Sequence, residues 1–167
     1  VTSSSARLDS SGDVSLTSGS SVSVSGVSAS VAVTDLLEVS SAEMAVRAGD
    51  RVSAYAGESV SLSTQDVSVS AGGSVSAFAG ESASLVSGRV SVSAAESLHV
   101  STGATGSLGF QTGSVGLTAD GEVSVASSSE VSVGGSTVRV SSAEDVGVTS
   151  GADLRLSSGG EIEVVSG

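Results

Sequence analysis

The chain has 167 residues, enough for one domain, but its composition is far from that of an ordinary globular protein. Serine supplies 44 residues, valine 29 and glycine 22, whereas proline, cysteine and lysine are absent. The lack of cysteine excludes a disulfide framework, a thiolate zinc site and a thiol nucleophile. A net charge of −12, with six arginines as the only strong cations, argues against nucleic acid or an anionic membrane as a partner. No apolar run approaches the roughly 20 residues of a membrane span.

Short segments in which valine alternates with serine recur along the chain. The triplet Val-Ser-Val occurs at 22–24, 67–69, 90–92, 123–125 and 131–133. Alternation with period 2 is typical of strands that bury one face. A disordered serine- and glycine-rich linker would lack this periodicity, so the segments predict a packed β-structure.

The segments belong to a repeat of 23 residues, as shown by the sequence AYAGES at 54–59, which returns as AFAGES at 77–82. In chain order, apolar–x–apolar triplets begin at 6, 14, 22, 29, 37, 44, 52, 60, 67, 75, 83, 90, 98, 108, 115, 123, 131, 138, 146, 154 and 162. From residue 29 the steps run 8, 7 and 8 and then repeat. The exceptions are a two-residue insertion around 101–107 and steps of 8 and 8 at the two ends. All 42 first and third positions are apolar.

Three short segments in each unit predict three faces joined by tight corners. A three-residue strand buries too little to be stable alone, but equivalent segments stacked one unit apart can pair above and below. Connections of four or five residues cannot hold a helical crossover. We therefore expect an all-β, single-chain, three-sided parallel β-helix (β-solenoid) of about seven coils, forming one domain over residues 1–167. Phe110 falls at an inward position, and glycines are expected at the sharp corners.

The repeat resembles the parallel β-helix and β-solenoid repeat proteins, which include surface adhesins, phage fibres, polysaccharide-cleaving enzymes and bactofilin-type filaments. The resemblance covers essentially the whole chain and includes no family-specific motif. A step of 7 in every 23 residues favours one chain that closes its own triangle over three interwound chains. Because the chain starts at Val1 and its repeat has no evident cap, we expect a segment of a longer repeat protein.

Residues that could carry catalysis are few. His99, the only histidine, is expected at an outward position one coil above Ser76 and near the insertion. A catalytic relay would also need an acid that converges on the same place, such as Glu81. Nothing marks a pocket or a positioned base, so we expect no catalytic residue, no cofactor site and no enzyme activity.

Carboxylates are expected to stack in two columns at the corners. One column contains Asp35, Glu58 and Glu81. The other contains Asp50, Glu96 and Glu144, interrupted by Gly73 and Gly121. Three interpretations are open: acids that keep the rod soluble, weak cation binding, or hydrolysis by paired carboxylates. No stretch fits the calcium-binding nonapeptide repeat, so we assign no metal ligand.

Tyr55 and Phe78 occupy equivalent outward positions on successive coils. Two stacked, exposed rings could contact a protein partner, a neighbouring rod or a sugar ring. The alternative is a local shift that tucks both rings over the corner. The sequence leaves these two arrangements open.

Two functions of different class follow. The first is a structural rod of a surface fibre, adhesin stalk or filament, without catalytic activity, whose partners are neighbouring repeats or identical subunits placed end to end. The second is a binding module for carbohydrate or a protein partner that uses Tyr55 and Phe78. Regular, acidic, lysine-free repeats favour an extracellular or cell-surface location, and a cytoplasmic filament is the other possibility.

Overall fold

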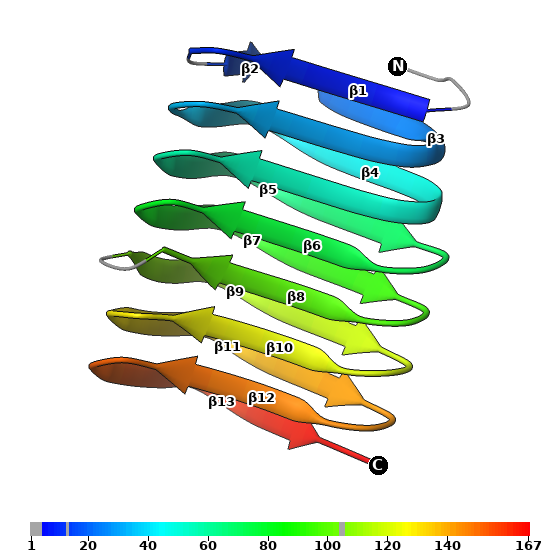
Figure 1. The fold of residues 1–167 in the computed structure, drawn as a ribbon. Helices are drawn as coiled ribbons and strands as arrows, with labels where there is room; N and C mark the ends of the chain where they lie inside the picture. The colour runs from blue at the N-terminus through cyan, green and yellow to red at the C-terminus, as the bar shows by residue number, and fades with distance from the viewer. Residues whose placement is uncertain (1–4, 13, 104–105) are drawn as a thin grey trace.

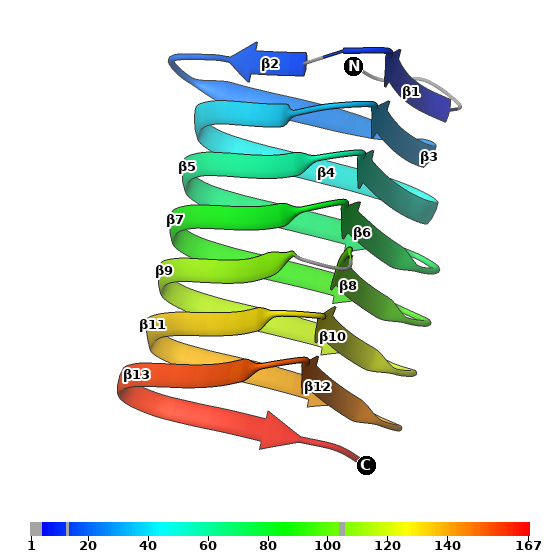
Figure 2. The same ribbon diagram turned by 60° about the vertical axis from the view of Figure 1, so that its left-hand side comes forward.

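The structure, a computed structural model of the chain, describes residues 5–12, 14–103 and 106–167. These residues form strands and turns and contain no helix. Figures 1 and 2 show coils that follow one another along a single axis, as in a parallel β-solenoid of about seven turns. The predicted fold class is confirmed. The start of the chain (1–4) and two positions of the insertion (104–105) lie outside the described residues.

Three faces run along the solenoid, each built from one triplet per coil. Face I holds the triplets that begin at 6, 29, 52, 75, 98, 123 and 146; face II follows it in each coil, and face III follows face II. Coils 1 to 7 each begin with the face I triplet. The strands are β1 (Ser5–Ser10), β2 (Val14–Thr17), β3 (Ser21–Val33), β4 (Leu37–Ala56), β5 (Ser59–Ala71), β6 (Val75–Ala79), β7 (Ser82–Ala94), β8 (Leu98–Thr102), β9 (Ser107–Ala119), β10 (Val123–Ser127), β11 (Glu130–Ser142), β12 (Val146–Ser150) and β13 (Asp153–Val165).

Every strand pairs in parallel with its equivalent one coil away. On face III, for example, Val67 pairs with Val90 and Val115 pairs with Val138. The offset is 23 residues in these pairs and 25 across the insertion, where Val90 pairs with Val115. The period read from the sequence is therefore the register of the sheet.

The strands are longer than the predicted triplets. β5, β7, β9, β11 and β13 each continue for 13 residues from face II to face III. The backbone pairing does not stop at this corner, where Thr64 still pairs with Ser87 one coil away. The corner is therefore a bend within a continuous ladder.

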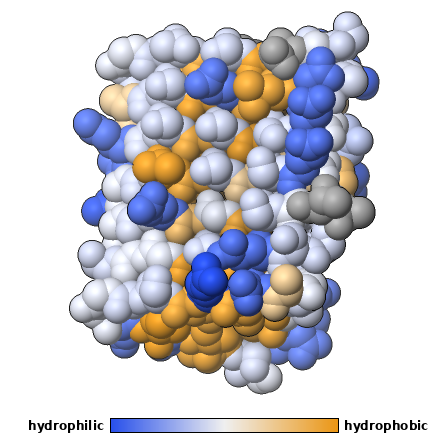
Figure 3. Space-filling view, turned by 90° about the vertical axis from the view of Figure 1, so that its left-hand side faces the viewer, coloured by the Kyte–Doolittle hydropathy of each residue, from blue (hydrophilic) through white to orange (hydrophobic). Residues whose placement is uncertain are grey.

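The core consists of the inward triplet positions together with the residue two places beyond the triplet on faces I and III, such as Ala56. Val123, Val131 and Val138 are completely buried. Phe110 is also buried, as predicted. On the side drawn in Figure 3, polar and charged side chains alternate with narrower apolar areas, and apolar side chains gather at the coil 7 end of the rod, at the bottom. The predicted division into inward valine and outward serine is thus the division between core and surface.

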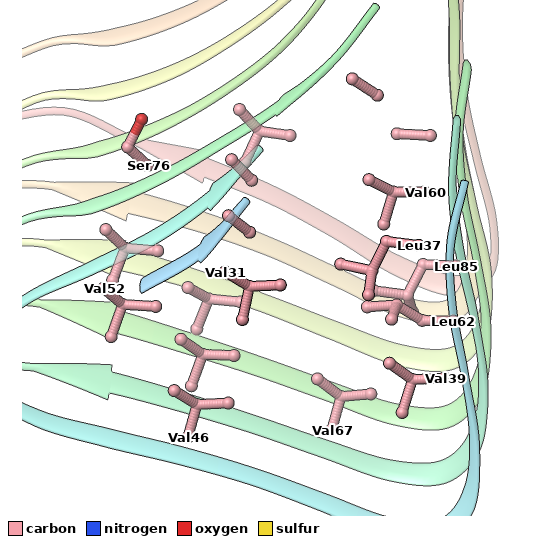
Figure 4. Close-up of a pocket in the computed structure, with 18 of the residues that line it drawn as sticks. Val31, Leu37, Val39, Val46, Val52, Val60, Leu62, Val67, Ser76 and Leu85 are labelled. Atoms are coloured by element: carbon pink, nitrogen blue, oxygen red, sulfur yellow. The ribbon is translucent and has the colours of Figure 1, made fainter. Parts of the chain in front are cut away.

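The middle of the prism is not completely filled. An apolar cavity of about 170 Å³ runs inside the coils, with Val31, Val39 and Val67 among the side chains around it (Figure 4). Ala54 and Ala77 line it at positions where Val31 and Val100 stand in neighbouring coils. Because methyl groups are missing there, the centre of the prism lacks packing partners.

The corner glycines are needed for close approach of two backbones. Gly57 and Gly80 lie at corners, as expected, but none of the described glycines has a positive φ, so a left-handed turn is not the reason for glycine there. A Cβ atom at Gly80 would collide with the carbonyl oxygen of Gly57 in the coil before it, and Gly80 N donates to Ala56 O at 3.0 Å. Successive coils touch at this corner through bare backbone.

The division into inward and outward positions predicts opposite effects for two adjacent substitutions. Val90→Asp places an unpaired carboxylate at a position that is 1% exposed, and it should lower the free energy of unfolding by more than about 4 kcal/mol. Ser91→Asp, whose paired neighbours are Ser68 and Gly116, should change it by less than about 0.5 kcal/mol. Urea unfolding followed by circular dichroism measures both, and equal losses would contradict the assignment of faces.

The close approach of two backbones at Gly80 predicts that alanine is tolerated at some glycine positions of the solenoid but not at this corner. Gly80→Ala should lower the free energy of unfolding by about 3 kcal/mol, because the new methyl group overlaps the Gly57 carbonyl and one backbone must move. Gly109→Ala is the matched control on β9, since a Cβ there meets nothing within 4 Å. We expect it to be neutral or to stabilise by about 0.5 kcal/mol, because alanine is favoured over glycine within a strand. A tolerated Gly80→Ala would show that the coils do not touch at this corner.

Candidate functional site

Tyr55 on β4 and Phe78 on β6 stack on one another at face I. Their positions are paired between coils 3 and 4, which places one ring directly over the other. The ring centroids lie 5.3 Å apart and the planes are inclined by 11°. Tyr55 is 49% exposed and Phe78 is partly buried. The rings therefore form an outward ladder with Tyr55 at its accessible end.

A shallow depression of about 480 Å³ adjoins Tyr55 on the side of coil 1. The residue paired with Tyr55 in coil 2 is Ala32, whose small side chain leaves the space that a third aromatic ring would fill. Asp9 lies one coil further on, with its carboxylate paired to Arg7, and Thr34 donates to Ser10 O at 3.4 Å. The depression thus combines an aromatic side chain with a carboxylate and hydroxyl groups.

His99 lies outward on β8, as expected. It is exposed, and its paired neighbours on the adjacent coils are Ser76 and Ser124. Glu81 follows β6 at the next corner of coil 4, where it belongs to the stack of acids described below. The geometry supplies no feature that would make these groups act together.

Both predicted columns of carboxylates are present. Glu58 N donates to Asp35 O at 3.1 Å and Glu81 N donates to Glu58 O at 2.6 Å, so these three acids succeed one another coil by coil. In the second column Gly73 lies between Asp50 and Glu96. Gly121 in turn lies between Glu96 and Glu144. Glycine thus separates the charges of the second column, whereas those of the first are adjacent.

Within the part of the chain that the structure describes, no arginine side chain forms an ion pair with the carboxylates of the first column, Asp35, Glu58 and Glu81. The ion pairs found there join Arg7 to Asp9, Arg139 to Glu161 and Glu163, and Arg155 to Glu130 and Asp153. Among the same residues, no group of three or more histidine, aspartate or glutamate side chains has the geometry to hold a metal ion. The column is therefore a line of like charges.

Sequence reasoning missed the buried corner serines. Ser87 is buried; its hydroxyl donates to Gln65 O at 3.0 Å and accepts from Arg89 N at 3.2 Å. Ser127 is buried likewise and donates to Gly106 O at 2.6 Å. These hydroxyls satisfy backbone groups that the bend leaves unpaired. Their recurrence at corner positions was the available signal, but abundant outward serine concealed it.

Comparison with protein-family models, curated proteins and solved structures gives no match. Over the described residues, no helix is long and apolar enough to cross a membrane. The fold and its surfaces define a single-chain, three-sided parallel β-solenoid.

The adjacent charges of the first column predict a stabilising substitution. Glu58→Gln should raise the free energy of unfolding by about 0.5 kcal/mol at low salt, and the gain should shrink as sodium chloride screens the repulsion. The matched control is Glu38→Gln, because Glu38 is outward and paired with Ser15 and Ser61. Thermal and urea unfolding with and without calcium chloride measure these effects. A calcium-dependent stabilisation lost in Glu58→Gln would contradict the interpretation as bare repulsion.

Proposed function

We propose that the chain is a structural rod without catalytic activity, which holds its two ends at a constant separation and presents regular faces. The observation that supports this most is that every coil from 1 to 7 pairs in parallel with the next, so that each coil is held by backbone hydrogen bonds to its neighbour. With coils about 4.8 Å apart, the rod is about 34 Å long.

The near absence of loops also supports a structural role. Within the described residues the face I strands are followed by short turns, and the largest departure from the repeat adds two residues between β8 and β9. Enzymes place their binding residues on loops that a rigid scaffold positions. The described part of this solenoid has only short connections between its strands. A place in a surface fibre, adhesin stalk or filament outside the cell agrees with the acidic, lysine-free surface.

A second candidate is a carbohydrate-binding module, favoured by the depression beside Tyr55. Sugar rings present flat apolar faces and peripheral hydroxyls. They would find an exposed aromatic ring at Tyr55, a carboxylate at Asp9 and hydroxyls at Ser10 and Thr34. The volume of about 480 Å³ lies within the range of small-molecule sites.

The rod function predicts one constant distance along the solenoid. Ser30 and Ser124 occupy the same outward column of face I, four coils apart, and the chain has no native cysteine. Spin labels on Ser30→Cys/Ser124→Cys should give one narrow distance distribution near 19 Å in pulsed electron resonance, unchanged by salt. Urea-unfolded protein supplies the broad reference. A native distribution of similar breadth would remove the case for a rigid spacer.

A glycan array distinguishes the second candidate from the first. The rod should bind no glycan. Specific binding that is lost in Tyr55→Ala/Phe78→Ala, with the label distance unchanged, would establish the binding module instead. Ser101→Ala, in the same outward column but beyond Phe78, is the control that should leave such binding intact.

A further inference from the structure

We propose that the interior of coils 3 and 4 is a binding site for a small, uncharged, apolar molecule. Such a site goes beyond the structural role, because that role depends on the length of the rod and on its outer faces, whereas the site lies inside. The apolar cavity of about 170 Å³ in the prism supplies the space (Figure 4).

Coil 4 has less side-chain volume inside the prism than coil 5. Its inward residues include Ala77 and Ala83, which pair with the larger Val100 and Leu108 of coil 5. In coil 3 the residue paired with Ala77 is Ala54, and all three alanines line the cavity. The space at these alanines therefore has coils of the same chain on both sides.

Other inward side chains of coils 3 and 4 keep surface that faces the cavity. Leu62 and Val69 of coil 3 and Leu85 and Val92 of coil 4 line the cavity and are only partly buried. The six inward valines of coil 6, by comparison, are at most 5% exposed. Core side chains in coils 3 and 4 thus lack packing partners, and a bound apolar molecule would supply the missing contacts.

Phe110 limits the cavity on the side of coil 5. It stands in the inward column of Leu62 and Leu85, and it pairs with Leu85. Its ring is 6% exposed and lines the cavity, and the lining ends with Leu117 of the same coil. The ring therefore separates the cavity from the closely packed interior of coil 6.

The lining determines the chemical class of the ligand. Valine, leucine and alanine side chains dominate it, whereas Ser53, Ser76 and Ser84 border it from outward positions of their strands. A polar or charged molecule would lose its hydration there without finding hydrogen-bond partners. Apolar cavities of about 150 Å³ stay dry and take up xenon or benzene, and this cavity has a similar volume. The geometry fits an uncharged apolar molecule of that size.

NMR of the folded chain under xenon pressure tests the site. Methyl resonances of Ala54, Ala77 and Leu85 should shift and saturate, whereas those of Val125 and Val133 in coil 6 should not move. Shifts of equal size in coil 6, or no saturable shift at all, would overturn the inference.

A variant that fills the space tests the position of the site. Ala54→Val/Ala77→Val should weaken xenon binding by more than about tenfold, because valine already occupies the same inward position in coils 2 and 5 and should fit here. The filled variant should also melt about 4 °C higher, since its new methyl groups gain packing partners. Undiminished xenon binding, or a lower melting temperature, would show that the space is not at these alanines.

The matched control is Ala32→Val/Ala126→Val. Both alanines are on face I like Ala54 and Ala77, but they stand at outward positions, where Ala32 pairs with Tyr55 and Ala126 with Ser101. The control should bind xenon as the original chain does. Loss of binding in the control would contradict a site inside the rod.

Thermal unfolding with benzene and with phenol tests the chemical class. Benzene should raise the melting temperature of the original chain, because it binds the folded state, and should have little effect on the filled variant. Phenol has the same ring with a hydroxyl group that would find no partner in the cavity, so it should stabilise less. Equal effects of the two compounds, or no effect of either, would contradict an apolar binding site.

Discussion

Each residue of this solenoid lies next to the residue at the same position of the neighbouring coil, at the spacing of parallel strands, about 4.8 Å. A side chain must therefore be compatible with a near copy of itself. Valine meets this condition inside, because its branched side chain stacks and packs across the prism. Serine meets it outside, where hydroxyls on successive coils can bond, as Ser59 and Ser82 do at 3.0 Å. The unusual composition follows from this single geometric requirement.

The same requirement explains how much of the fold could be predicted. The period gives the register directly, so the pairing of Val67 with Val90 followed from the spacing of the triplets. The alternation within each triplet predicted which side chains face the core, and Phe110 is buried as this predicts. The carboxylate columns were predictable for the same reason, because Glu58 and Glu81 are one period apart.

The position of the corners could be predicted but not their detailed geometry, because this geometry depends on how closely the backbones of two coils approach. The sequence shows a glycine at position 80, but it does not show that a side chain there would collide with the backbone of Gly57. It shows serine at 87 among many serines but not that this hydroxyl turns inward to the backbone. The stacking of Tyr55 on Phe78 was likewise open, since a small rotation at the corner would have tucked the rings away.

The aromatic pair stands on the outer side of strands whose inner side faces part of the interior cavity. In coils 3 and 4 the inward residue is alanine, where neighbouring coils have valine, and the cavity lies against both alanines. Alanine in place of valine removes two methyl groups from each of these coils. The loss lowers the free energy of unfolding by roughly 1–2 kcal/mol per methyl group. The residue after each alanine is aromatic, and a stacked pair returns roughly 0.5–1.5 kcal/mol on the outer surface. These two coils therefore have less apolar packing inside the rod and a stacked aromatic pair on its surface.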